Sequence, residues 1–114
     1  MHPDLNVLAD PTRRTMLALL ALEQELCVCE LEAALDQLQP VVSRQLAILR
    51  NAEWLDARRD GRRIYYRIGD VPPWARTILN GLTSGGVPPE DLRAARQRLA
   101  DFVDRPIRLL RNAS

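Results

Sequence analysis

Two short amphipathic helices separated by a tight turn constrain this fold more than any other feature of the sequence. Val28, Leu31 and Leu35 recur at the spacing of one helix face. Residues 36–39 predict a tight turn. Pro40, a residue type suited to the first turn of a helix, opens a second helix that runs to about residue 52. This order predicts a helix-turn-helix.

The apolar pattern then changes from helical to alternating. Residues 54–59 and 62–68 are predicted strands on either side of Asp60-Gly61. That dipeptide favours a two-residue hairpin turn in which both central residues have positive φ. A β-hairpin directly after a helix-turn-helix predicts a winged helix-turn-helix, a mainly α fold with a small β-hairpin.

Helices are also predicted on both sides of this unit. Asp10-Pro11 is a helix start, because Asp caps free N–H groups and Pro suits the first helical position; a helix over 12–22 follows. Another helix begins at Trp74, residues 84–89 form a linker, and a last helix runs from 90 to about 102. We expect one domain over 1–86 and a C-terminal helical extension over 87–114.

The charge distribution singles out the predicted hairpin. All 16 basic residues are arginine against 15 acidic residues, so the net charge is +1. Residues 1–57 sum to −5, residues 58–67 to +4 and residues 68–114 to +2. A small basic element on a near-neutral body is typical of a few placed phosphate contacts. A solvated hairpin is the alternative from charge alone, and the winged-helix order favours DNA.

Composition excludes several other classes of protein. Hydrophobic residues make up 46% of the 114-residue chain, enough for one core and too many for a disordered chain of this charge. The longest apolar run, residues 16–22, is far shorter than the ~20 residues of a membrane span. No charged-then-apolar leader opens the chain, so we expect a cytoplasmic protein.

The chain contains two cysteines, Cys27 and Cys29, one residue apart. We expect this spacing to make a poor disulfide, and a cytoplasmic setting also opposes one. Two thiols at the mouth of a helix suggest a chelate for a soft metal or metalloid. Cys27 takes the capping position of a capping box that Glu30 completes. The alternative is that both are small buried hydrophobes.

The expected positions of the two sulfurs suggest a link to DNA. A sulfur at the N-cap and another at the second helical residue do not share a helical face. We therefore expect one ion bound to both to distort the first turn, which begins the helix-turn-helix.

Several motifs resemble the ArsR/SmtB family of winged-helix repressors, and are most like its arsenical-resistance operon repressors. The resemblance covers about residues 4–84 and rests on DPTR at 10–13, ELCVCEL at 25–31, ALDQ at 34–37, QPxVSRxLxxLR at 39–50 and GRxxYYR at 61–67. It implies a homodimer that represses a resistance operon from a two-fold symmetric double-stranded operator. Trivalent arsenic or antimony on Cys27 and Cys29 would then release the DNA, with no constitutive cofactor.

The chain departs from this family's pattern at several positions. Leu38 stands where a capping Ser is usual, and Glu53 where a Gly is common. Glu32 stands where close relatives often carry a third cysteine. Inorganic trivalent arsenic has three exchangeable ligand positions, and the two thiols of this chain fill only two of them. A trivalent organoarsenical with one As–C bond needs only two, which keeps such a compound open as the inducer. Some relatives carry a zinc site of Asp and His after the wing; the one histidine here is His2, so we expect none.

Residues off the buried stripe of the second helix reach base edges in this type of fold. Arg44 suits guanine and Gln45 suits adenine, with a solvated surface residue as the alternative for Gln45. The arginines of the wing suit phosphate or the minor groove, while Arg67 is a candidate for pairing within the protein. The predicted DNA contacts are Gln39, Val41, Ser43, Arg44, Gln45, Arg58, Arg59, Arg62 and Arg63.

A two-fold operator requires a dimer. The predicted interface consists of apolar residues near the N-terminus and on the helix after the wing: Leu5, Leu8, Trp74, Ile78, Leu79 and Leu82. Intrachain core is the alternative for Leu5 and Leu8.

Two other functions compete with the metalloid sensor. In a redox-responsive DNA-binding regulator, Cys27 and Cys29 would react with oxidants. A small thiol enzyme is disfavoured, because the sequence shows no Gly-rich phosphate loop and its only histidine, His2, is terminal, so no nucleophile–base pair is evident. We therefore expect a regulator and not an enzyme.

Overall fold

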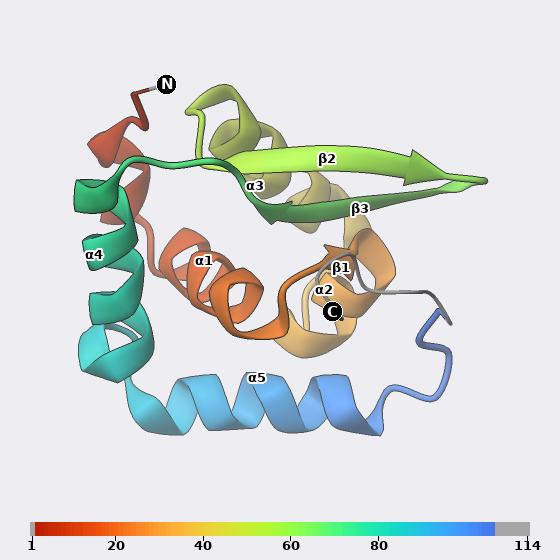
Figure 1. Ribbon diagram of the computed structural model, residues 1–114. Helices are drawn as coiled ribbons and strands as arrows, with labels where there is room; N and C mark the ends of the chain where they lie inside the picture. Colours follow the sequence, from red (N-terminus) through yellow and green to blue (C-terminus); the bar gives the residue numbers. More distant parts are fainter. Residues whose placement is uncertain (1, 107–114) are drawn as a thin grey trace, which may run out of the picture.

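The computed structural model describes residues 2–106, and it has the expected winged helix-turn-helix fold (Figure 1). Residues 107–114 of the predicted C-terminal extension lie outside the described part. The elements in chain order are η1 (Leu5–Ala9), α1 (Pro11–Glu23), β1 (Leu26–Cys27), α2 (Val28–Leu35), α3 (Gln39–Asn51), β2 (Leu55–Asp60), β3 (Arg63–Ile68), α4 (Pro73–Gly81), η2 (Leu82–Gly86) and α5 (Pro89–Asp101). In Figure 1 the β2–β3 hairpin crosses one side of the molecule, α5 covers the other, and α1 lies between them.

Local signals placed the helix starts correctly. The Asp10 carboxylate accepts a hydrogen bond from the N–H of Arg13 at 3.0 Å, with Pro11 as the first residue of α1. Helix α3 has Leu38 at its N-cap with no side-chain hydrogen bond, and Pro40 in its first turn. Because proline carries no N–H, one fewer donor there needs a cap. After the helix, Glu53 takes a positive φ of 68° at the position where the family commonly has glycine.

The hairpin turn lies one residue later than predicted. Asp60 pairs with Arg63 across the strands, so the central residues of the turn are Gly61 and Arg62. Of these two, only Gly61 has a positive φ, at 63°. Glycine at the first central position is the requirement of a type II′ turn, whereas Asp60-Gly61 would form type I′. Our prediction of that dipeptide as the turn was wrong, because glycine alone supplies the needed φ and Asp60 stays in the strand.

A third strand, which the sequence did not predict, completes the sheet. In the strand order β1-β3-β2, Leu26 pairs with Tyr66 and Cys27 with Tyr65. A two-residue strand is too short to show an alternating pattern. Strand β1 covers Tyr65, which is only 3% exposed. Arg63 and Arg67, on the same face of β3, are exposed.

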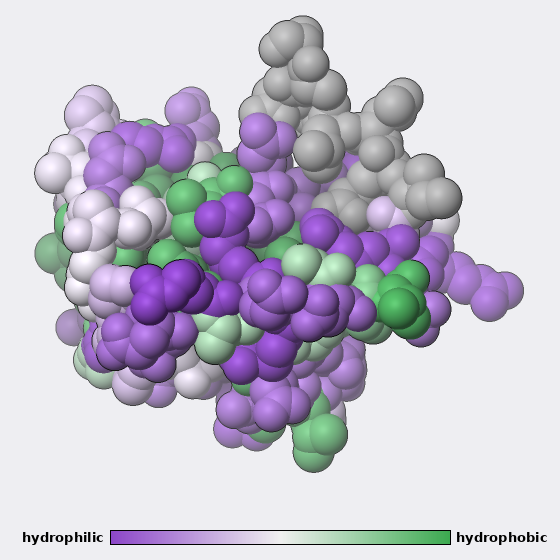
Figure 2. Space-filling view, turned by 90° about the horizontal axis from the view of Figure 1, so that it is seen from below, coloured by the Kyte–Doolittle hydropathy of each residue, from purple (hydrophilic) through white to green (hydrophobic). Residues whose placement is uncertain are grey.

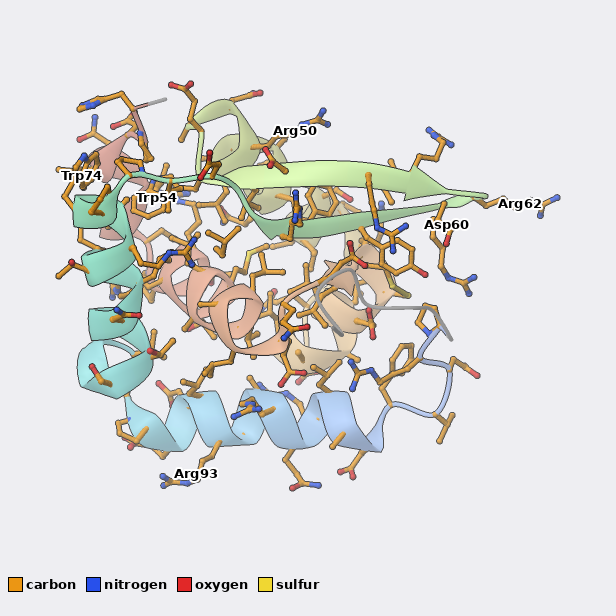
Figure 3. The ribbon with its side chains drawn as sticks, in the orientation of Figure 1. Arg50, Trp54, Asp60, Arg62, Trp74 and Arg93 are labelled. Carbon is orange, nitrogen blue, oxygen red and sulfur yellow. A yellow bond between two sulfur atoms is a disulfide. The ribbon has the colours of Figure 1, made fainter. Side chains whose placement is uncertain are left out.

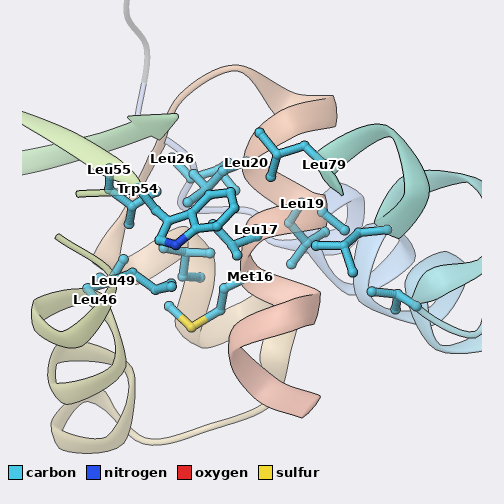
Figure 4. Packing of buried hydrophobic residues seen from close by; sticks show 14 of the residues in the cluster. Met16, Leu17, Leu19, Leu20, Leu26, Leu46, Leu49, Trp54, Leu55 and Leu79 are labelled. Atoms are coloured by element: carbon cyan, nitrogen blue, oxygen red, sulfur yellow. The ribbon is translucent and has the colours of Figure 1, made fainter. Parts of the chain in front are cut away.

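The core forms around α1. Five consecutive residues of this helix, numbers 16–20, are buried, so α1 is covered on nearly all sides. Figure 4 shows its side chains gathered about the indole of Trp54, with Leu46 and Leu49 of α3 beside them. The Trp54 indole N–H donates to the carbonyl of Asp4 at 2.8 Å, so its polar atom is satisfied in the core. This packing holds the N-terminal segment, α3 and the hairpin in one unit.

Helix α4 turns part of the predicted dimer surface inward. Leu79 and Leu82 are 1% and 7% exposed and belong to the chain's own core, because α4 and the η2 turn pack on α1. Trp74 is 37% exposed and Leu5 53%, while Leu8 and Ile78 are half-buried. Two of the six predicted interface residues are therefore accounted for within one chain.

Candidate functional site

Cys27 and Cys29 lie where β1 passes into α2. Cys27 is 1% exposed and has extended backbone at the N-cap of α2, while Cys29 is half-buried in the first turn. The structure joins their sulfurs in a disulfide, with the Cα atoms 5.5 Å apart. Our expectation of a poor disulfide was wrong, because one extended and one helical residue bring the Cα atoms into the usual range. The first turn of α2 stays helical in this disulfide form, and the distortion expected from an ion bound to both sulfurs remains a prediction.

Two buried carboxylates flank the cysteines, and each is paired with an arginine. Glu30 is fully buried; it accepts a hydrogen bond from the Cys27 N–H at 2.9 Å and one from Arg105 Nε at 2.7 Å. Glu25, 3% exposed, accepts from Nε and Nη2 of Arg58 at 2.6 and 2.7 Å. These hydrogen bonds raise the pKa of the Arg58 guanidinium above its usual value. Buried carboxylates require such partners, so each arginine stabilises one side of the cysteine site.

The predicted DNA-contacting residues of α3 lie on its outer face. Arg44 is exposed, and the Gln39 amide donates to the Ser43 hydroxyl at 2.8 Å. Val41 is half-buried. The face is thus polar around Arg44, as a base-reading surface requires.

Gln45 is held by a residue that the sequence analysis did not select. Its side-chain oxygen accepts from Arg13 Nη1 at 3.0 Å, and Arg13 Nε donates to the carbonyl of Val7 at 2.8 Å. Arg13 therefore braces α3 against α1 and η1. No local signal marks this contact, because Gln45 and Arg13 lie 32 residues apart in sequence.

The wing divides its arginines between solvent and protein. Arg59, Arg62 and Arg63 are exposed, and Figure 3 shows Arg62 at the hairpin tip, directed away from the body. Arg58 differs, because Glu25 and the Tyr65 ring, whose centroid lies 4.6 Å from its guanidinium carbon, hold it against the sheet. Arg67 Nη2 lies 4.0 Å from Asp56 Oδ2, so Arg67 forms a weak, partly exposed ion pair within the protein, as predicted.

The face that α5 covers is mainly polar (Figure 2). Figure 2 looks onto the face that α5 covers, where hydrophilic residues dominate; Arg93, Arg96 and Gln97 are exposed there. Among the described residues, no group of three or more His, Cys, Asp or Glu side chains comes together to hold a metal ion. Nor does the described part of the chain contain a helix long and apolar enough to cross a membrane.

The chain is similar to known bacterial regulatory proteins. Residues 10–55 match the family described as "Bacterial regulatory protein, arsR family". The chain is 46% identical over 100 residues to the arsenic resistance transcriptional regulator ArsR1 of Pseudomonas putida, covering 87% of this chain and 77% of that protein. It is 45% identical over 75 residues to the arsenical resistance operon repressor of Escherichia coli, covering 65% of this chain and 64% of the repressor.

A solved structure has a similar fold over most of this chain. Reduced HlyU from Vibrio cholerae superposes with a TM-score of 0.63 at 26% identity, covering 70% of this chain and 81% of that one.

Proposed function

Because the chain belongs to the arsR family of bacterial regulatory proteins, a family of transcriptional regulators and not of enzymes, we propose that it is an arsenic-responsive repressor. In this proposal a cytoplasmic homodimer binds a two-fold symmetric operator and leaves it when trivalent arsenic or antimony binds Cys27 and Cys29. The observation that carries the proposal is the meeting of both sulfurs at the start of the helix-turn-helix.

DNA binding is assigned to α3 and to the tip of the hairpin. Arg44, with Gln39 and Ser43 beside it, faces outward from α3 and suits base edges in the major groove. Arg59, Arg62 and Arg63 suit phosphate, because each is exposed on the wing. We leave Arg58 out of the contacts, since its Nε and Nη2 already donate to the buried carboxylate of Glu25. Gln45 contributes through the position that Arg13 gives it.

Sensing is assigned to the reduced form of the cysteine pair. Two thiols condense with arsenous acid: two As–S bonds form, two As–OH bonds break, and two molecules of water leave. One hydroxyl stays on inorganic arsenic, whereas a trivalent organoarsenical with one As–C bond is fully satisfied by the two sulfurs. The two-thiol site is therefore matched in ligand number to organoarsenicals, and this preference is a finer form of the same proposal.

The dimer interface is assigned to predicted apolar residues that are not buried within a single chain. Trp74 and Leu5 are exposed, with Leu8 and Ile78 half-buried. Apolar side chains of this size are stabilised by burial against a partner.

A titration of labelled operator DNA tests the proposal. Arsenite, antimonite and phenylarsine oxide are added separately to the reduced protein on DNA, and fluorescence anisotropy measures release. We expect release by all three, with phenylarsine oxide acting at the lowest concentration, and no release from a Cys27→Ser/Cys29→Ser variant. Unchanged operator binding in all three titrations would refute the arsenic sensor.

A thiol redox-responsive regulator is the second candidate, and the observed disulfide favours it. In that case peroxide takes two electrons and two protons from the pair, forms the disulfide and becomes water. The two candidates separate in the same assay. Release by peroxide without release by arsenite supports the redox regulator, and the reverse supports the arsenic sensor.

A further inference from the structure

One rung of the sheet connects the cysteine site to the wing. Cys27 of β1 lies opposite Tyr65 of β3, and Tyr65 lies opposite Arg58 of β2. Directly opposite residues of neighbouring antiparallel strands place their side chains on the same face. A candidate ligand-binding cysteine and an arginine of the wing therefore share one rung across three strands.

Glu25 joins the two ends of this rung. It lies two residues before Cys27, and its carboxylate accepts both hydrogen bonds that Arg58 directs at it, at 2.6 and 2.7 Å. The Arg58 guanidinium carbon also lies 4.6 Å from the centroid of the Tyr65 ring. Glu25 and Tyr65 are each 3% exposed and the Arg58 side chain is 25% exposed, so water and salt weaken this pairing less than they weaken a fully exposed ion pair.

The two-residue strand β1 makes this side-chain pairing important. With only two register pairs, the backbone ladder gives β1 a weak hold on β3. A two-pronged arginine–carboxylate pair has a narrow preferred geometry, so it adds a directional constraint between β1 and β2. Gly61 in the turn lies three residues beyond Arg58, which at ~3.3 Å per residue is about 10 Å along the strand. A small tilt of the hairpin at Arg58 therefore displaces the wing tip by a larger distance.

We propose that Glu25, Arg58 and Tyr65 are positioning residues that transmit the ligand state of the cysteine pair to the wing. A ligand held by Cys27 and Cys29 changes the end of β1, and the Glu25–Arg58 pair passes this change to the hairpin. The proposal deepens the function assigned above and rests on it. It also gives Arg58, which Glu25 holds against the sheet, a role other than phosphate contact.

Arg59 provides the matched control. It is the next residue on β2, carries the same charge and is exposed, and strand alternation directs it to the opposite face from Arg58. Replacing it removes one wing charge and leaves the Glu25–Arg58 pair untouched.

The experiment compares the coupling between arsenite and operator DNA. For the reduced wild type, Glu25→Gln and Arg59→Gln, calorimetry measures arsenite affinity, and anisotropy measures operator affinity without and with saturating arsenite. The ratio of the two operator affinities is the coupling factor. We expect Glu25→Gln to bind arsenite within about threefold of wild type and to lose at least tenfold of the coupling factor. Arg59→Gln should weaken operator binding and keep the coupling factor.

Two results would overturn the proposal. A coupling factor in Glu25→Gln equal to that of wild type shows that the pair carries no signal. Equal losses in Glu25→Gln and Arg59→Gln show that the effect is not specific to the Glu25–Arg58 pair. If Glu25→Gln fails to fold, Glu25→Gln/Arg58→Gln, in which two neutral amides replace the ion pair, takes its place with the same criteria. A wild type that shows no response to arsenite fails the function itself, a result distinct from the first two.

Discussion

Replacing Arg62 and Arg63 by glutamine should reduce both the affinity for the operator and its dependence on salt. Both residues are exposed at or beside the hairpin turn, and Figure 3 shows Arg62 directed away from the body of the protein, whereas Glu25 holds Arg58. In a homodimer the double substitution removes about four phosphate contacts, and each contributes ~0.9 to the slope of log affinity against log salt. The slope should therefore fall by about 3.6.

That change in slope corresponds to a large difference in salt sensitivity. Between about 50 and 200 mM salt, wild type should lose on the order of a hundredfold more affinity than the double variant. Fluorescence anisotropy on labelled operator at four or five salt concentrations measures both slopes. Arg93→Gln is the matched control, because Arg93 is exposed on α5 on the opposite side of the molecule and should leave the slope unchanged. A slope that stays within about one of the wild-type value would remove the wing tip from the DNA contacts.

Further predictions concern the cysteine site, the core and the dimer. Cys27→Ser places a strong capping residue at an N-cap that already has extended backbone, so folding and operator binding should persist while release by arsenite is lost; an unfolded variant in circular dichroism would contradict this. Leu46→Ala, at a fully buried residue of α3, should lower the free energy of unfolding in urea by about 2–5 kcal/mol, whereas Ile48→Ala, 36% exposed on the same helix, should cost under ~1 kcal/mol. Trp74→Asp should shift the dimer toward monomer in sedimentation velocity; an unchanged dimer would exclude this residue from the interface.

Sequence alone predicted those helices, strands and caps that depend on residues close together in the chain. Asp10 caps α1 three residues ahead, the apolar stripe of α3 repeats within the helix, and the alternation of β2 and β3 lies within fifteen residues. Each signal acts over one or two turns of helix or one hairpin, so its physical cause is visible in the local sequence. One local error, the turn at Asp60-Gly61, arose because type I′ and type II′ turns place the same glycine at different central positions.

Tertiary structure decided which of the predicted site residues are paired within the protein, and which residues they pair with. Arg58 looked like its neighbours on the wing until Glu25, 33 residues earlier, was found to hold it. Leu79 and Trp74 occupy the same short helix, yet only packing on α1 shows that the first is core and the second is exposed. The two sulfurs meet because Cys27 belongs to a strand that exists only when β3 is beside it. Residue type and spacing determined the fold and the chemistry on offer, while contacts across the chain assigned the partners, because distant side chains meet only once the core is packed.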